Sequence, residues 1–87
     1  MKDIIYRTSG TCSRAIHVVI DDEGRITTCE FAGGCNGNLK GIGALVVGQR
    51  AEDVIGRVRG IQCNGRPTSC PDQLALALQE ALSAADA

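Results

Sequence analysis

An alternating pattern of apolar residues early in the chain constrains its fold more than any other feature of the sequence. Residues 14–21 place an apolar side chain at every second position, at Ile16, Val18 and Ile20, which is the period of a strand with one buried face. The next four residues, Asp22-Glu23-Gly24-Arg25, are typical of a hairpin turn in which glycine takes a left-handed backbone. Residues 26–32 are rich in β-branched side chains, which favour a return strand. The segment therefore predicts an antiparallel hairpin.

This hairpin also decides where two of the five cysteines should lie. Cys12 comes just before the first strand, and Cys35 comes just after the second. Antiparallel pairing brings the start of one strand and the end of its partner to the same end of the sheet. We therefore expect Cys12 and Cys35 to lie side by side, although 23 positions separate them in the sequence.

Apolar spacing predicts one more strand and three helices around the hairpin. The short apolar run at residues 3–7 is expected to be an opening strand, and residues 39–48 favour a helix over a strand. Residues 51–60 begin with acidic and end with basic side chains, which suits a short helix. With the last helix after Pro71, the expected architecture is α+β, a three-stranded antiparallel meander packed against about three helices.

Two of these helices carry apolar faces that are expected to cover the sheet. In the first helix this face consists of Leu39, Ile42, Val46 and Val47, and Gly41 and Gly43 would permit close packing. In the last helix the stripe consists of Leu74, Ala77, Leu78, Ala81, Leu82 and Ala85. Leu76 lies on the other side of the last helix and is expected to be exposed or to contact another subunit.

The last helix begins at a cysteine, in the run Thr68-Ser69-Cys70-Pro71-Asp72. Proline suits the first helical position, so either Ser69 or Cys70 is expected to be the N-cap. A sulfur there faces unpaired backbone N–H groups and the positive end of the helix dipole. Both favour the thiolate, which is the form that attacks as a nucleophile and binds metals. Cys63 supplies a second sulfur seven positions upstream.

Four of the cysteines fall in predicted loops and are the expected metal ligands: Cys12, Cys35, Cys63 and Cys70. Four thiolates suit zinc or an iron–sulfur cluster, although no C-x-x-C pair is present to strengthen the prediction. Cys29 lies within a predicted strand and is expected to be an apolar filler. The alternative is redox chemistry, in which Cys63 and Cys70 cycle between dithiol and disulfide.

Composition excludes several classes of function. The 87 residues are expected to form one domain, residues 1–87, with a net charge of −1, no basic run and two aromatic residues, Tyr6 and Phe31. Nucleic-acid binding usually needs a basic surface and stacking aromatics, so it is not expected. No apolar run reaches the length of a membrane span, and residues 1–5 lack a signal-peptide core. We therefore expect a cytoplasmic protein with reduced cysteines.

The run TSCPDQLALAL, with GGCNGN and GIQC upstream, resembles the TSCPD-domain family, which takes its name from that pentapeptide. Its members occur as small proteins and as C-terminal appendages of some ribonucleotide reductases, notably cobalamin-dependent ones. The resemblance implies a link to ribonucleotide reduction and DNA precursor synthesis, with a ribonucleotide reductase as a partner. A chain of 87 residues cannot form the reductase barrel, and it has no nucleotide-site motif. Whether it is an enzyme is left open.

Residues 10–35 also resemble the hairpin of the U-type iron–sulfur scaffold proteins. In that family one cysteine precedes the first strand, a second follows the return strand, and a third precedes the C-terminal helix, which matches Cys12, Cys35 and Cys70. The resemblance implies a scaffold-like fold, zinc or a nascent cluster as the ligand, and iron–sulfur assembly proteins as partners. Ser69 stands where those scaffolds have a histidine, so Cys63 is the expected fourth ligand. A homodimer is also possible.

Overall fold

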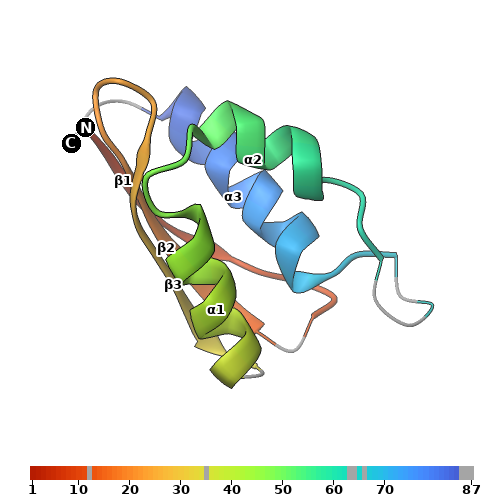
Figure 1. The fold of residues 1–87 in the computed structure, drawn as a ribbon. Coiled ribbons are helices and arrows are strands. Elements are labelled where there is room, and N and C mark those ends of the chain that lie inside the picture. The colour runs from red at the N-terminus through yellow and green to blue at the C-terminus, as the bar shows by residue number, and fades with distance from the viewer. Residues whose placement is uncertain (12, 35, 63–64, 66, 85–87) are drawn as a thin grey trace.

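The computed structural model describes residues 1–11, 13–34, 36–62, 65 and 67–84 (Figure 1). This part of the chain forms three strands followed by three helices. The strands are β1 (Lys2–Arg7), β2 (Ser13–Ile20) and β3 (Ile26–Gly33), and the helices are α1 (Asn36–Val46), α2 (Ala51–Val58) and α3 (Cys70–Ser83).

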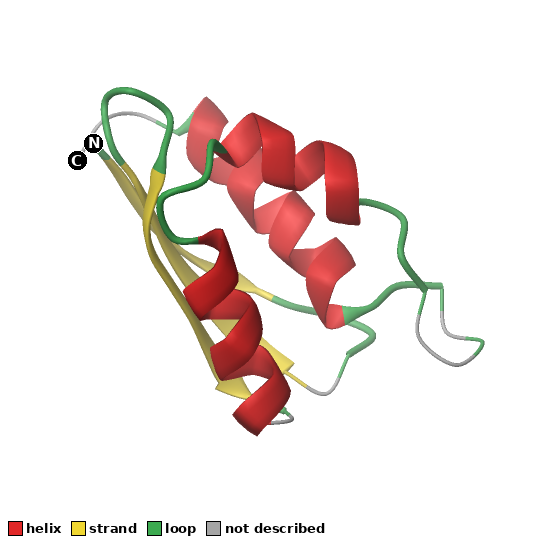
Figure 2. Cartoon of the chain, in the orientation of Figure 1, coloured by secondary structure: helices red, strands yellow, loops and turns green. Residues whose placement is uncertain are grey.

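The strands form one antiparallel sheet in the order β1-β2-β3. The helices of the described chain cover one face of this sheet and leave the other face open (Figure 2). The architecture confirms the α+β prediction of a three-stranded meander packed against helices. Ser13 pairs with Gly33 at the end of the hairpin, so the residue after Cys12 and the residue two positions before Cys35 meet at one end of the sheet. Cys12 and Cys35 themselves lie outside the described residues.

The core forms where the alternating face of β2 meets the apolar stripe of α3. Side chains with at most 1% exposure come from both elements: Ile16, Val18, Ile20, Leu74, Ala77, Leu78 and Ala81. Ala75 is also fully buried, outside the predicted stripe, and Leu76 is half-buried rather than exposed. Val47 does not join the core, because α1 ends at Val46 and the Val47 side chain is 45% exposed.

A glycine sets how closely α1 approaches the sheet. A Cβ atom on Gly43 would lie 2.5 Å from the backbone oxygen of Cys29 on β3, which is too short for any side chain. The predicted role of Gly43 in close packing is therefore confirmed. The same prediction for Gly41 is wrong, because a Cβ atom there would meet nothing within 4 Å.

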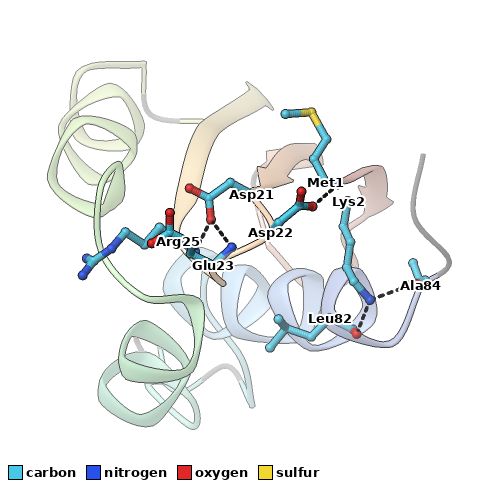
Figure 3. Close-up of polar contacts among 8 residues, drawn as sticks. All are labelled: Met1, Lys2, Asp21, Asp22, Glu23, Arg25, Leu82 and Ala84. Atoms are coloured by element: carbon cyan, nitrogen blue, oxygen red, sulfur yellow. Dashed lines mark hydrogen bonds and ion pairs between the residues drawn. The ribbon is translucent and has the colours of Figure 1, made fainter.

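Polar contacts tie the chain's first residues to the hairpin turn and to the end of α3 (Figure 3). Lys2 Nζ donates to the carbonyl oxygens of Leu82 and Ala84, each at 2.7 Å, and so satisfies carbonyls that a helix end leaves without intrahelical partners. The terminal amine of Met1 lies 2.6 Å from Asp22 in the turn. The edge strand β1 is thereby fixed against the last helix.

Candidate functional site

The candidate site lies at the start of α3, where the sequence sets the local structure residue by residue. Ser69 has an extended backbone, and its hydroxyl accepts a hydrogen bond of 3.2 Å from the N–H of Asp72, which is the geometry of an N-cap. Of the two N-caps that the sequence left open, Ser69 is therefore the observed one. Cys70 is the first helical residue, and Pro71 is the second rather than the first, a position where its missing N–H still costs no intrahelical bond.

The thiol of Cys70 reaches the end of the sheet. Its sulfur lies 3.4 Å from the hydroxyl oxygen of Ser13, 57 positions away in the sequence. Ser13 is the residue after Cys12 and pairs with Gly33, two residues before Cys35. The start of α3 thus meets the end of the hairpin that the sequence analysis singled out.

The predicted ligands are only partly within the described chain. Cys70 is described, whereas Cys12, Cys35 and Cys63 lie outside the described residues. In the ranges that the structure describes, no group of three or more His, Cys, Asp or Glu side chains could hold a metal ion.

Gln73 joins two loops to the first turn of α3. Its side chain is 4% exposed. Its Oε1 accepts from the backbone N–H of Ser9, in the loop after β1, at 3.2 Å, and its Nε2 donates to the hydroxyl of Thr68, in the loop before α3, at 2.9 Å. The loops themselves touch, because a Cβ atom on Gly10 would lie 2.9 Å from the Thr68 methyl group. We call Ser9, Thr68 and Gln73 the loop latch.

Asp72 extends the same network to the end of α2. One of its carboxylate oxygens accepts from the N–H of Gly60 at 2.6 Å, and the other accepts from the Thr68 hydroxyl. The Thr68 hydrogen bond, then the Gly60 N–H and the nearby charge of Arg59, hold the pKa of Asp72 below its usual range. The carboxylate is therefore charged at neutral pH and links Gly60, after α2, to Thr68, before α3.

The sequence alone does not identify Gln73 and Asp72 as contributors to this site. One signal was available, since Ser69 and Asp72 have the S-x-x-D spacing of a capping box. In such a box the acidic side chain returns to the N-cap, whereas here it reaches Gly60 and Thr68 instead. Gln73 gives no comparable signal, because its partner Ser9 lies 64 positions away.

Cys29, which was expected to be an apolar filler, behaves as predicted. Cys29 is 8% exposed within the core, and burial, with the neighbouring Glu30 carboxylate, raises its pKa to about 12. It is therefore a protonated, unreactive thiol at neutral pH. His17 alternates along β2 with the buried side chains of Ile16 and Val18, and its Nε2 lies 2.7 Å from Asp3 Oδ1. It is a partly exposed surface residue.

Fold and site together define a small α+β domain in which a helix that begins at a cysteine contacts the end of an antiparallel sheet. The chain belongs to the TSCPD domain family, whose model matches residues 3–82. The signature pentapeptide, Thr68 to Asp72, is the segment that caps α3 and supplies Cys70. No curated protein and no solved structure matches the chain significantly. Among the described helices, none has the length and apolar character needed to cross a membrane.

Proposed function

We propose that this protein is a metal-binding accessory module that holds zinc or an iron–sulfur cluster through Cys12, Cys35, Cys63 and Cys70. The observation that carries the proposal is the 3.4 Å contact between Cys70 Sγ and Ser13 Oγ. This contact joins the start of α3 to the residue that follows Cys12. Ser13 in turn pairs with Gly33, which is two residues before Cys35.

The chemistry of the donor set supports a metal. Four cysteines in loops are the usual ligands of structural zinc and of iron–sulfur clusters. Cys70 also has the environment of a thiolate, since it is the first residue of a 14-residue helix, where backbone N–H groups stabilise negative charge. When bound, zinc would cross-link the loops, and a cluster would add electron transfer.

The loop latch supports the metal-binding role, although none of its residues is a proposed ligand. Ser9 lies three residues before Cys12, and Thr68 lies five residues after Cys63. Gln73 holds both of these latch residues against the helix that begins with Cys70. One described residue near Cys12 and one near Cys63 are therefore bonded to α3 by protein contacts alone.

The family membership extends the proposal to partners. Because TSCPD domains also occur as C-terminal appendages of some ribonucleotide reductases, we include a reductase among the proteins that this module serves. The resemblance to the U-type scaffolds adds iron–sulfur assembly proteins. The competing function is a redox relay. In that case Cys63 and Cys70 would together lose two protons and two electrons in forming a disulfide, and a disulfide of the partner would take them up as two thiols.

A matched pair of variants tests the metal site. Purified protein is reduced without oxygen, loaded with zinc and freed of excess metal before zinc is measured by elemental analysis. Wild type and Cys29→Ala are expected to retain about one equivalent, because Cys29 is a buried, protonated thiol. Cys70→Ser is expected to retain almost none, as are Cys12→Ser and Cys35→Ser. Circular dichroism confirms that each variant is folded.

The behaviour of Cys63 distinguishes the metal site from the redox relay. In a closed four-cysteine site, Cys63→Ser loses the metal as completely as Cys70→Ser does, and neither thiol reacts with iodoacetamide while metal is bound. Retention of zinc by Cys70→Ser would contradict the proposal. Rapid formation of a Cys63–Cys70 disulfide in a protein that never binds metal would favour the redox relay instead.

A further inference from the structure

An apolar groove lies on the helical side of the molecule, away from the open face of the sheet. It has a volume of about 440 Å³ and is lined by side chains of α1 and α2, by Gln49 between these helices, by Ile61 and by Pro71 at the start of α3. Its floor consists of core residues such as Val46 and Val54, which are 8% and 6% exposed. The groove therefore opens directly onto the hydrophobic core.

The edge of this groove carries apolar side chains that the fold leaves uncovered. Leu45 on α1 is 77% exposed and Ile61 is 44% exposed, and both line the groove. Leu45 is the most exposed large apolar residue in the described part of the chain. An apolar groove with uncovered apolar side chains at its edge is a surface that another protein chain can cover.

The charged groups at the groove indicate what covers it. Asp53 and Arg57 line the groove one helical turn apart on α2, and neither forms an ion pair within the described residues. A surface with one acid and one base at this spacing is complementary to itself. When two such helices pack antiparallel about a two-fold axis, each acid faces the base of the other.

We propose that two copies of the chain associate through this groove about a two-fold axis. Leu45 of each protomer covers the apolar floor of the other, and Asp53 of each protomer faces the partner's Arg57. The proposed dimer does not depend on the proposed metal site, because none of the residues in the groove is a proposed metal ligand. Pro71 connects the groove to the proposed metal site, however, because it lines the groove and follows Cys70. The second copy would therefore shield the Pro71 side of the proposed metal site.

Sedimentation velocity on the full chain, from about 1 to 500 µM, tests the dimer. Leu45→Lys is expected to raise the dimer dissociation constant at least tenfold, because burial of one leucine changes an equilibrium by about 10- to 150-fold. Ile5→Lys is the matched control. Ile5 is 70% exposed but lies on β1, away from the groove, so its replacement should leave the dimer intact.

Charge reversal tests the two-fold arrangement itself. Asp53→Lys and Arg57→Glu should each weaken self-association, because each places like charges opposite one another. Mixing the two variants should restore a dimer that contains one copy of each, and the double variant D53K/R57E should again form a homodimer. Thermal melting of each variant at low concentration confirms that the monomer remains folded.

Three results would overturn the proposal. The first is a wild-type chain that stays monomeric throughout the concentration range, which would leave the groove to a different protein. The second is a dimer that survives Leu45→Lys. The third is a dimer that Ile5→Lys dissociates, because the contact would then lie on the open face of the sheet.

Discussion

Replacing Gln73 with leucine removes the side chain that joins both loops to the start of α3. The change deletes two hydrogen bonds, from Ser9 N–H and to the Thr68 hydroxyl, at a side chain that is 4% exposed. Leucine has a similar size and an equally good helix propensity. The measured effect should therefore come from the lost hydrogen bonds rather than from the helix.

The expected cost follows from these contacts. Each hydrogen bond contributes about 1 kcal/mol net, and a desolvated group without a partner adds to the loss. The free energy of unfolding should thus fall by about 2–3 kcal/mol. For a domain of this size each kcal/mol corresponds to about 4–8 °C, so the melting temperature should fall by roughly 10–20 °C.

Chemical denaturation and amide hydrogen exchange of metal-free protein are the assays. The Ser9 amide should exchange at least about tenfold faster in Gln73→Leu, because its acceptor is gone. Gln79→Leu is the matched control, since Gln79 is half-buried in the same helix and makes no side-chain hydrogen bond within the described residues. A loss below 0.5 kcal/mol for Gln73→Leu, or an equal loss for Gln79→Leu, would refute the loop latch.

Three further predictions concern the rest of the fold. Lys2→Met should lower the free energy of unfolding by about 1–2 kcal/mol in denaturant titrations, because two carbonyl oxygens at the end of α3 lose their donor; no change would mean that the contact is not formed in solution. Gly43→Ala should cost about 1–3 kcal/mol, since its methyl group would meet the Cys29 oxygen. Gly41→Ala should instead stabilise by up to about 1 kcal/mol, and the reverse order would contradict the packing of α1. Asp72 has a folded pKa below its unfolded value, so the stability that its carboxylate contributes is complete above about pH 4 and is lost as the pH falls through the folded pKa. Asp72→Asn should therefore weaken the acid dependence of the free energy of unfolding. An unchanged pH profile in this variant would contradict the role of Asp72.

The strands could be predicted because their signal is local. Alternation at Ile16, Val18 and Ile20 predicted both the buried face and the hairpin. In the folded chain all three side chains are at most 1% exposed. The hairpin pairs Ser13, the residue after Cys12, with Gly33, two residues before Cys35. Local periodicity and antiparallel pairing were sufficient to predict the strands and this pairing.

The rest of the site depends on contacts that no local pattern encodes. Gln73 looked like an ordinary polar residue in an apolar helix, and only the folded chain brings Ser9 to it. Val47 followed the helical spacing of α1, but the helix ends one residue earlier and leaves it exposed. Tertiary packing, which propensity and periodicity do not describe, decided both cases.

The metal content of the protein, isolated in the absence of oxygen, is the decisive measurement for the proposed metal site. Elemental analysis for zinc and iron, together with acid-labile sulfide and a visible absorption spectrum, identifies both the metal and its form. We predict about one zinc per chain, or one iron–sulfur cluster, with the metal lost in Cys70→Ser and kept in Cys29→Ala. A folded protein that contains neither metal, and that melts at the same temperature with added zinc as with a chelator, would contradict this prediction.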